Sequence, residues 1–149
     1  MTVIDSQTQM LLQDILRRER CSVLQYVAEA FPWTTSTETK SLASLQHLIA
    51  AEREAMIGLW QYMLRQRIRL PYLPSYPANF TTINFLAFDY VVPMLIEHQR
   101  QSIADLERDL AALKDPGVRA EIEKLLTVKR QHLLQLEALV SSQPQASLT

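Results

Sequence analysis

Three glutamates and one histidine are spaced along this sequence in a way that could bind a transition metal. Each lies near the middle of a segment with helical periodicity and falls on the apolar stripe of that segment: Glu19, Glu52, Glu97 and His132. Polar side chains are rarely placed in a core without a partner, and carboxylate and imidazole groups suit iron(II), manganese(II) and zinc. If the segments pack side by side, these residues meet at one level of a helix bundle.

The composition and the periodicity predict four long helices in a single domain. The 149-residue chain contains only 2 glycines and 7 prolines, which favours helix, and its length suits one domain with an apolar core. Apolar residues recur at alternating steps of three and four residues. We therefore expect one domain over residues 1–149, with helices over about 6–30, 36–69, 82–113 and 116–140 and a frayed tail over 141–149.

Local signals mark several helix starts. Ser6 with Gln9, and Thr35 with Glu38, have the spacing of a capping box, in which each side chain satisfies a free backbone donor of the first turn. Asp115 comes directly before a proline, which is typical of a cap followed by the first helical residue. These signals predict the starts of the first, second and fourth helices.

The segment LPYLPSYPANF, residues 70–80, contains three prolines and is expected to be extended. About eleven extended residues reach roughly 35 Å, which is about the length of a helix of 25 residues. A bundle whose helices simply alternate in direction needs only a short turn at this point, whereas a ferritin-like bundle has a long crossover there. The sequence therefore predicts an all-α, four-helix bundle with a long extended crossover between its second and third helices.

Charge and cysteine content exclude several classes of partner and site. The formal net charge is -1, which argues against a nucleic-acid surface. The single cysteine, Cys21, can form neither an internal disulfide nor a thiolate metal site. The first ten residues lack the pattern of a signal peptide, and no run of about 18 apolar residues could span a membrane. We therefore expect a cytoplasmic protein without a membrane partner.

The third helix carries a second apolar stripe besides the one that contains Glu97. This stripe predicts a homodimer, because a helix that is apolar on two sides suits a partner subunit. Its residues are Ile96, Ile103, Leu106, Leu110 and Leu113.

Three stretches, RRERCSVLQYVAEAFPW, YPANFTTINFLAFDYVVPMLIEHQRQSIADLE and VKRQHLLQLEAL, resemble an uncharacterised group of short bacterial ferritin-like proteins. More broadly, nearly the whole chain is similar to the ferritin-like superfamily of carboxylate-bridged di-iron proteins, such as the rubrerythrins and bacterioferritins. That family pattern has one glutamate on the first helix, Glu-x-x-His on the second, one glutamate on the third and Glu-x-x-His on the fourth.

The resemblance implies a site that this chain keeps only in part. Glu19 and Glu97 match the glutamates of the first and third helices. Glu52 matches the glutamate of the second helix, but Ala55 stands where the family has histidine. On the fourth helix His132 matches the histidine, while the glutamate position holds a lysine, Lys129.

Two functions are open on this basis. In the first, Glu19, Glu52, Glu97 and His132 bind iron or manganese, as a mononuclear or partial dinuclear site, and support oxygen- or peroxide-related redox chemistry. In the second, Lys129 replaces the metal charge by pairing with the glutamates, no cofactor binds, and the bundle is a structural or protein-interaction module. The sequence does not decide whether the protein is an enzyme, and it identifies no redox partner.

Overall fold

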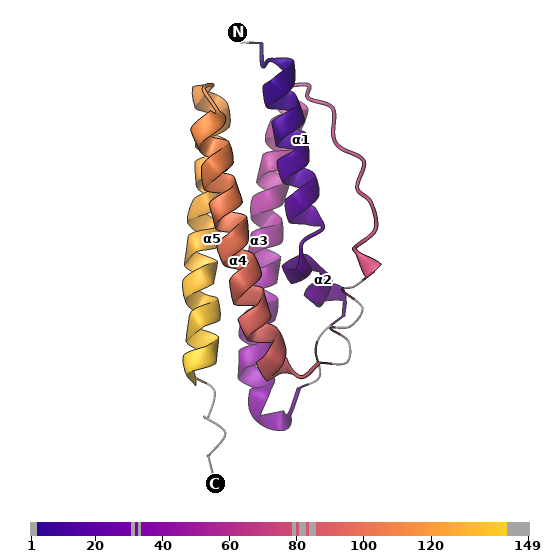
Figure 1. Cartoon of the computed structure of the whole chain (residues 1–149), viewed down its shortest axis with the longest axis vertical. Coiled ribbons are helices and arrows are strands. Elements are labelled where there is room, and N and C mark those ends of the chain that lie inside the picture. Colours follow the sequence, from indigo (N-terminus) through magenta and orange to yellow (C-terminus); the bar gives the residue numbers. More distant parts are fainter. Residues whose placement is uncertain are drawn as a thin grey trace.

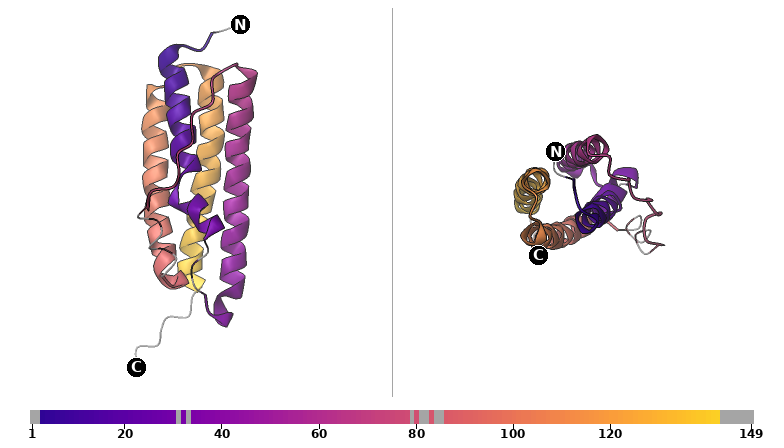
Figure 2. Two further views of the ribbon diagram at one scale, coloured as in Figure 1. Left: turned by 90° about the vertical axis from the view of Figure 1, so that its right-hand side faces the viewer. Right: turned by 90° about the horizontal axis from the view of Figure 1, so that it is seen from above.

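The computed structural model describes residues 3–30, 32, 34–78, 80, 83 and 86–142. This part of the chain is all-helical and has no strand, which confirms the predicted fold class at that level. Four long helices lie side by side, and one short helix continues the line of the first (Figures 1 and 2). The elements are α1 (Ser6–Arg20), α2 (Val23–Glu29), the 3₁₀ turn η1 (Ser36–Glu38), α3 (Thr39–Arg65), α4 (Phe88–Ala112) and α5 (Pro116–Ser142).

The first predicted helix, over residues 6–30, is two helices. The chain leaves helical geometry at Cys21 and Ser22, and α2 begins at the next residue. The hydroxyl of Ser22 accepts the backbone N–H of Gln25 at 3.3 Å. This cap satisfies one of the free donors that a new helix start creates, so the local hydrogen bond stabilises the break.

The other helix starts follow the predicted caps with one correction. Asp5, not Ser6, caps α1, because its Oδ1 accepts the N–H of the third following residue at 2.7 Å. The Glu38 carboxylate accepts the N–H of Thr35 at 2.8 Å, as expected. Asp115 Oδ1 accepts the N–H groups of the second and third following residues at 2.9 and 3.0 Å, which confirms the cap of α5.

Two helix ends differ from the prediction. α3 ends at Arg65 instead of residue 69, and Arg67 has a φ of 57°, a left-handed conformation that an α-helix cannot contain. α4 begins at Phe88, and the predicted start at residue 82 lies outside the described residues. The first two residues of the predicted frayed tail, 141 and 142, belong to α5, and the tail lies outside the described residues from residue 143 onward.

The segment that leaves α3 runs beside α1 and α2 as irregular, extended chain (Figure 1). Near its start, the main-chain carbonyl of Arg69 accepts a hydrogen bond from Gln13 Nε2 at 2.7 Å. Further along, the ring of Tyr76 packs edge-on against that of Tyr26, with centroids 5.2 Å apart. The segment therefore follows α1 and α2 in the same direction, and α4 then runs parallel to α3 (Figure 1).

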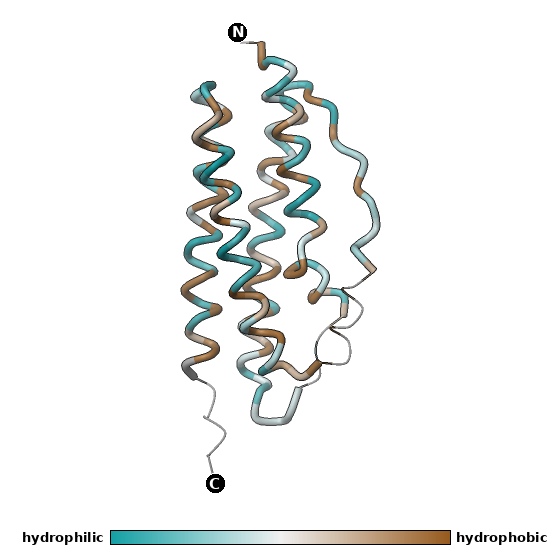
Figure 3. The backbone as a smooth tube through the Cα atoms, viewed as in Figure 1, coloured by the Kyte–Doolittle hydropathy of each residue, from teal (hydrophilic) through white to brown (hydrophobic). Residues whose placement is uncertain are grey.

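The apolar core consists of two clusters of buried side chains. One contains residues of α1 and the later half of α3, such as Leu12 and Met63. The other contains residues of α2 and the earlier half of α3, such as Val27 and Ile49. Apolar and polar residues alternate along every long helix (Figure 3), and none of the helices described combines the length and hydropathy needed to cross a membrane. The level between the two clusters is where the polar residues of the core are found.

α4 is rotated relative to the prediction. Tyr90, which lies seven residues before Glu97 and therefore on the same face of the helix, is 72% exposed. The stripe assigned to a partner subunit instead packs in the chain's own core, where Ile103 and Leu106 are buried. That stripe therefore no longer supports a homodimer, which stays a prediction.

Candidate functional site: a buried lysine between two carboxylates

Lys129 on α5 lies at the centre of a buried polar network. Only 1% of the residue is exposed. Its Nζ donates to Oε2 of Glu19 on α1 and to Oε1 of Glu52 on α3, at 2.6 Å in both cases. These short, charge-assisted hydrogen bonds link three of the four long helices through one ammonium group.

The remaining two carboxylate oxygens are also bound by side chains. On α4, Ser102 Oγ donates to Glu19 Oε1 at 2.7 Å. Gln99 Nε2 lies 3.1 Å from Glu52 Oε2 and 3.0 Å from a main-chain carbonyl of α5. His132 Nδ1 lies 2.8 Å from the same Glu52 oxygen, and since an ionised carboxylate only accepts, Nδ1 carries the proton. Each of the four carboxylate oxygens therefore accepts a hydrogen bond from a side chain.

The network holds its central pair in the charged form. Burial alone would raise the pKa of Glu52, but the charge of Lys129 and the hydrogen bonds from His132, Lys129 and Gln99 outweigh it and lower the pKa to about 2. Burial alone would lower the pKa of Lys129, but the charges and hydrogen bonds of Glu19 and Glu52 outweigh it, and the pKa is raised. Glu52 is therefore ionised and Lys129 protonated at neutral pH.

Arg18 supplies a second positive charge at the edge of this network. Its Nε lies 3.7 Å from Glu19 Oε1, and its Nη2 pairs with Oδ2 of Asp109 on α4 at 2.8 Å. Two buried carboxylates with one ammonium would leave an excess negative charge, which is costly in a core. The guanidinium of Arg18 lies near Glu19, but its direct ion pair is with Asp109, itself a buried carboxylate, so its charge is shared between the two.

Three of the four predicted site residues meet here, and the fourth does not. Glu97 is exposed and pairs with Arg100 at 2.7 Å on the surface of α4, so its predicted inward position is wrong. Gln99 and Ser102 contribute from α4 instead. Sequence reasoning missed both, although Gln99 lies between Ile96 and Ile103 on the stripe that turned out to face the core.

The residues present do not fit an iron or manganese ion. The Lys129 ammonium lies between Glu19 and Glu52, where a bridging cation would have to bind. Nδ1 of His132 carries a proton toward Glu52, so this nitrogen has no free lone pair for a metal. Among the described residues, no group of three or more His, Cys, Asp or Glu side chains could hold a metal ion. Hydrogen-bond donors of the protein, including the Lys129 ammonium, thus occupy the carboxylate oxygens that a metal ion would need as ligands.

A cavity of about 150 Å³ lies beside the network, between α1 and α4. Its lining includes the exposed His98 as well as the buried Gln99 and Lys129, so it connects the surface with the polar layer. This volume corresponds to roughly five water molecules at about 30 Å³ each.

No protein-family model, no curated protein and no solved structure matches this chain. The resemblance to ferritin-like proteins therefore stays an expectation from the sequence.

Proposed function

We propose that this chain is a ferritin-like four-helix bundle whose internal carboxylates are neutralised by a lysine. In this proposal the first helix of the bundle consists of α1 and α2 together, and the other three are α3, α4 and α5. The connection between α3 and α4 is the long crossover. The parallel course of α3 and α4 supports this topology, because two helices that follow one another in the chain and run parallel need a connection as long as the bundle.

The hydrogen bonding of the two core carboxylates is the observation that supports a metal-free core most strongly. All four oxygens of Glu19 and Glu52 accept hydrogen bonds from protein side chains. A metal could replace these donors only if Lys129 moved its charge out of the core, which would leave polar groups to be rehydrated or paired elsewhere. The protein donors therefore compete directly with any cation for the same lone pairs.

We propose further that the protein works as a structural or protein-interaction module. In the described site, the ionisable residues are bound to one another, and the high pKa of Lys129 keeps its amine protonated and non-nucleophilic. A fully satisfied buried network rigidifies a core and favours one arrangement of helices. Such a core suits a scaffold better than a reaction centre.

Metal binding is the second candidate, and the convergence of Glu19, Glu52 and His132 favours it. These three residues could bind an iron or manganese ion if Lys129 were displaced. The proposed metal-free core and this alternative make opposite predictions for one experiment.

The test is anaerobic titration with iron(II) and manganese(II), followed by desalting and elemental analysis. We expect the natural protein to retain far less than about one ion per chain. A variant with Lys129→Glu and Gln99→Glu should gain binding, because it replaces the ammonium and an amide with carboxylates. Glu97→Gln is the matched control on the exposed face of α4 and should change nothing.

One result would assign the natural protein to the second candidate. Retention of about one ion per chain, lost in Glu52→Gln and kept in Glu97→Gln, would overturn the metal-free proposal. The predicted homodimer is tested separately by light scattering coupled to size-exclusion chromatography, which measures the mass against the 17.2 kDa of one chain.

A further inference from the structure

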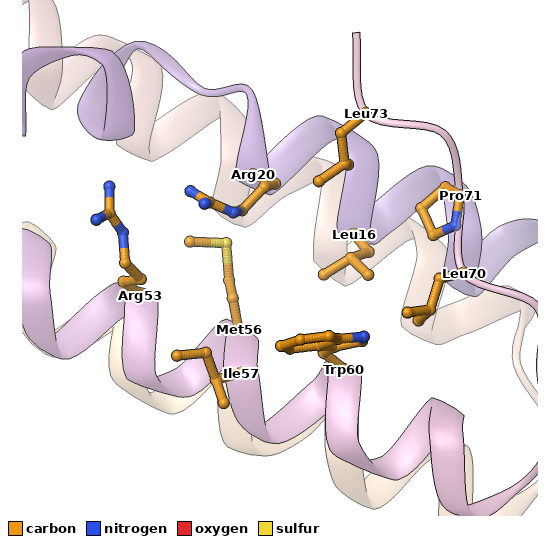
Figure 4. A pocket seen from close by; sticks show the side chains of 9 residues that line it. All are labelled: Leu16, Arg20, Arg53, Met56, Ile57, Trp60, Leu70, Pro71 and Leu73. Atoms are coloured by element: carbon orange, nitrogen blue, oxygen red, sulfur yellow. The ribbon is translucent and has the colours of Figure 1, made fainter. Parts of the chain in front are cut away.

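A second cavity, separate from the Lys129 network, lies between α1, α3 and the connection that follows α3 (Figure 4). Its volume is about 310 Å³. Most of its wall is apolar and includes Leu16, Met56, Trp60 and Leu70. This volume is at the small end of the range for ligand-binding cavities.

Two arginines lie together at one end of this cavity. Figure 4 shows the guanidinium groups of Arg20 and Arg53 at the same end of the cavity, away from the end lined by Trp60 and Leu70. Within the described chain, neither arginine forms an ion pair with a carboxylate. The cavity is therefore apolar along its length and positively charged at one end.

The position of Arg53 is fixed by a buried partner. Its Nε donates to Oε1 of Gln25 at 3.0 Å, and Gln25 is fully buried. Its Nη2 is also buried and has no hydrogen-bond partner. A buried donor without an acceptor is unfavourable, so Arg53, which lines the cavity, has a hydrogen-bond donor that the protein does not satisfy.

We propose that this cavity binds a small amphipathic carboxylate, of the kind formed by a medium-chain fatty acid. A guanidinium matches the geometry of a carboxylate and can bind it through two parallel hydrogen bonds. The carboxylate lies against Arg53 and Arg20, and the hydrocarbon chain lies along Leu16, Met56 and Trp60. This activity is independent of whether the Lys129 network binds a metal.

The volume limits the size of the ligand. At about 30 Å³ for one water-sized group, the cavity holds roughly ten non-hydrogen atoms. Octanoate, with eight carbons and two oxygens, has that size. We therefore choose octanoate as the probe, 1-octanol as the uncharged chain of equal length and acetate as the charge without the chain.

Trp60 lines the cavity and provides a direct signal. We expect octanoate to change the tryptophan fluorescence in a saturable way and to bind with a stoichiometry of one by calorimetry. Octanol and acetate should bind at least about tenfold more weakly, because each lacks one half of the interaction. Equal affinity for octanol and octanoate, or no saturable binding of octanoate, would overturn the proposal.

Two variants test the charged end. Arg53→Gln and, independently, Arg20→Gln should each weaken octanoate binding by at least about tenfold and leave octanol binding unchanged. The second variant covers the case in which loss of the Gln25 contact impairs folding of the first. Arg130→Gln is the matched control, because Arg130 pairs with Glu107 on the exposed surface. If both cavity variants bind octanoate as the control does, the arginines do not recognise the carboxylate and the proposal fails.

Discussion

Replacement of Lys129 by methionine is the sharpest test of the buried network. The change keeps a long, unbranched side chain and removes the ammonium that contacts Glu19 and Glu52 at 2.6 Å. Both carboxylates then remain in the core, each still bound by a neutral donor but without the charge between them. Removing one partner of a buried ion pair typically costs about 3–5 kcal/mol. Against a domain stability of about 5–15 kcal/mol, this is a large fraction.

The assay is urea unfolding followed by circular dichroism, because the described chain is helical. At pH 7 we expect Lys129→Met to lower the unfolding free energy by about 3–5 kcal/mol. Part of this loss should be recovered at pH 5, where protonation of a carboxylate relieves the repulsion between the two groups. Adding Glu19→Gln to the variant should also recover part of it, because only one uncompensated charge remains.

The control and the refuting result are both well defined. Lys124→Met changes an exposed lysine that pairs with Glu121 at 3.1 Å on the surface, and it should alter stability by no more than about 0.5 kcal/mol. If Lys129→Met costs no more than this control, the buried ammonium does not compensate the carboxylates, and the argument for a lysine in place of a metal is wrong.

Four further predictions concern the pH dependence of Glu52, the pH dependence of Lys129, the helix break and the exposed glutamate. The pKa of Glu52 is lowered from 4.5 to about 2, so the ionised group stabilises the fold by about 3 kcal/mol. This stabilisation is present above pH 4.5 and is lost as the pH falls through 2. Urea unfolding between pH 6 and 2 measures it, and an unfolding free energy that does not change with pH would contradict it. The pKa of Lys129 is raised in the folded protein, so the pH dependence of its stabilisation runs the other way. The stabilisation is complete below pH 10.5 and is lost only as the pH rises through the higher pKa of the folded state. Unfolding curves at alkaline pH measure this loss. Ser22→Ala removes the cap of α2 and should cost about 1 kcal/mol by urea unfolding, whereas no loss would show that the hydroxyl does not stabilise the break. Glu97→Gln should change stability by less than about 0.5 kcal/mol, and a loss as large as that of Lys129→Met would contradict its surface position.

The buried faces of α3 and α5 could be predicted because each helix has a single apolar stripe. On α3 that stripe includes Ile49, Glu52 and Met56, and all three are buried. On α5 the same holds for Lys129 and His132. A single stripe leaves one way to turn the helix toward the core, so the inward position of these ionisable residues follows from the spacing alone.

α4 could not be predicted in the same way because its sequence offers two stripes. The choice of Glu97 followed from its charge and from the ferritin-like pattern, and the structure places that side chain on the surface. The other stripe contains Gln99 between Ile96 and Ile103, at steps of three and four residues. An uncharged amide side chain is a weak sign of a polar site in a sequence. Gln99 is nevertheless the residue of α4 that contacts Glu52.

The break after α1 was missed for a different reason. Apolar periodicity continues across it, since Leu16 and Val23 are both buried, so the stripe gives no sign that the helix stops. The cap at Ser22 is a local interaction, and it has the same spacing to Gln25 that was used to predict other helix starts. Apolar periodicity indicates which face of a helix is buried, whereas a cap indicates where the helical backbone hydrogen bonds begin or end. Here the periodicity continues through residues 21 and 22, although the helix is interrupted there.

The network behaves as one unit because its donors and acceptors come from four helices. Glu19 lies on α1, Glu52 on α3, Gln99 and Ser102 on α4, and Lys129 on α5. Any single substitution therefore leaves a buried partner unsatisfied on another helix, and the effects of two substitutions cannot add. A metal ion could bind only after several of these contacts had broken together. The same connectivity that would exclude the ion fixes the relative positions of the helices, and the Lys129 ammonium contributes to both effects through its hydrogen bonds to Glu19 and Glu52.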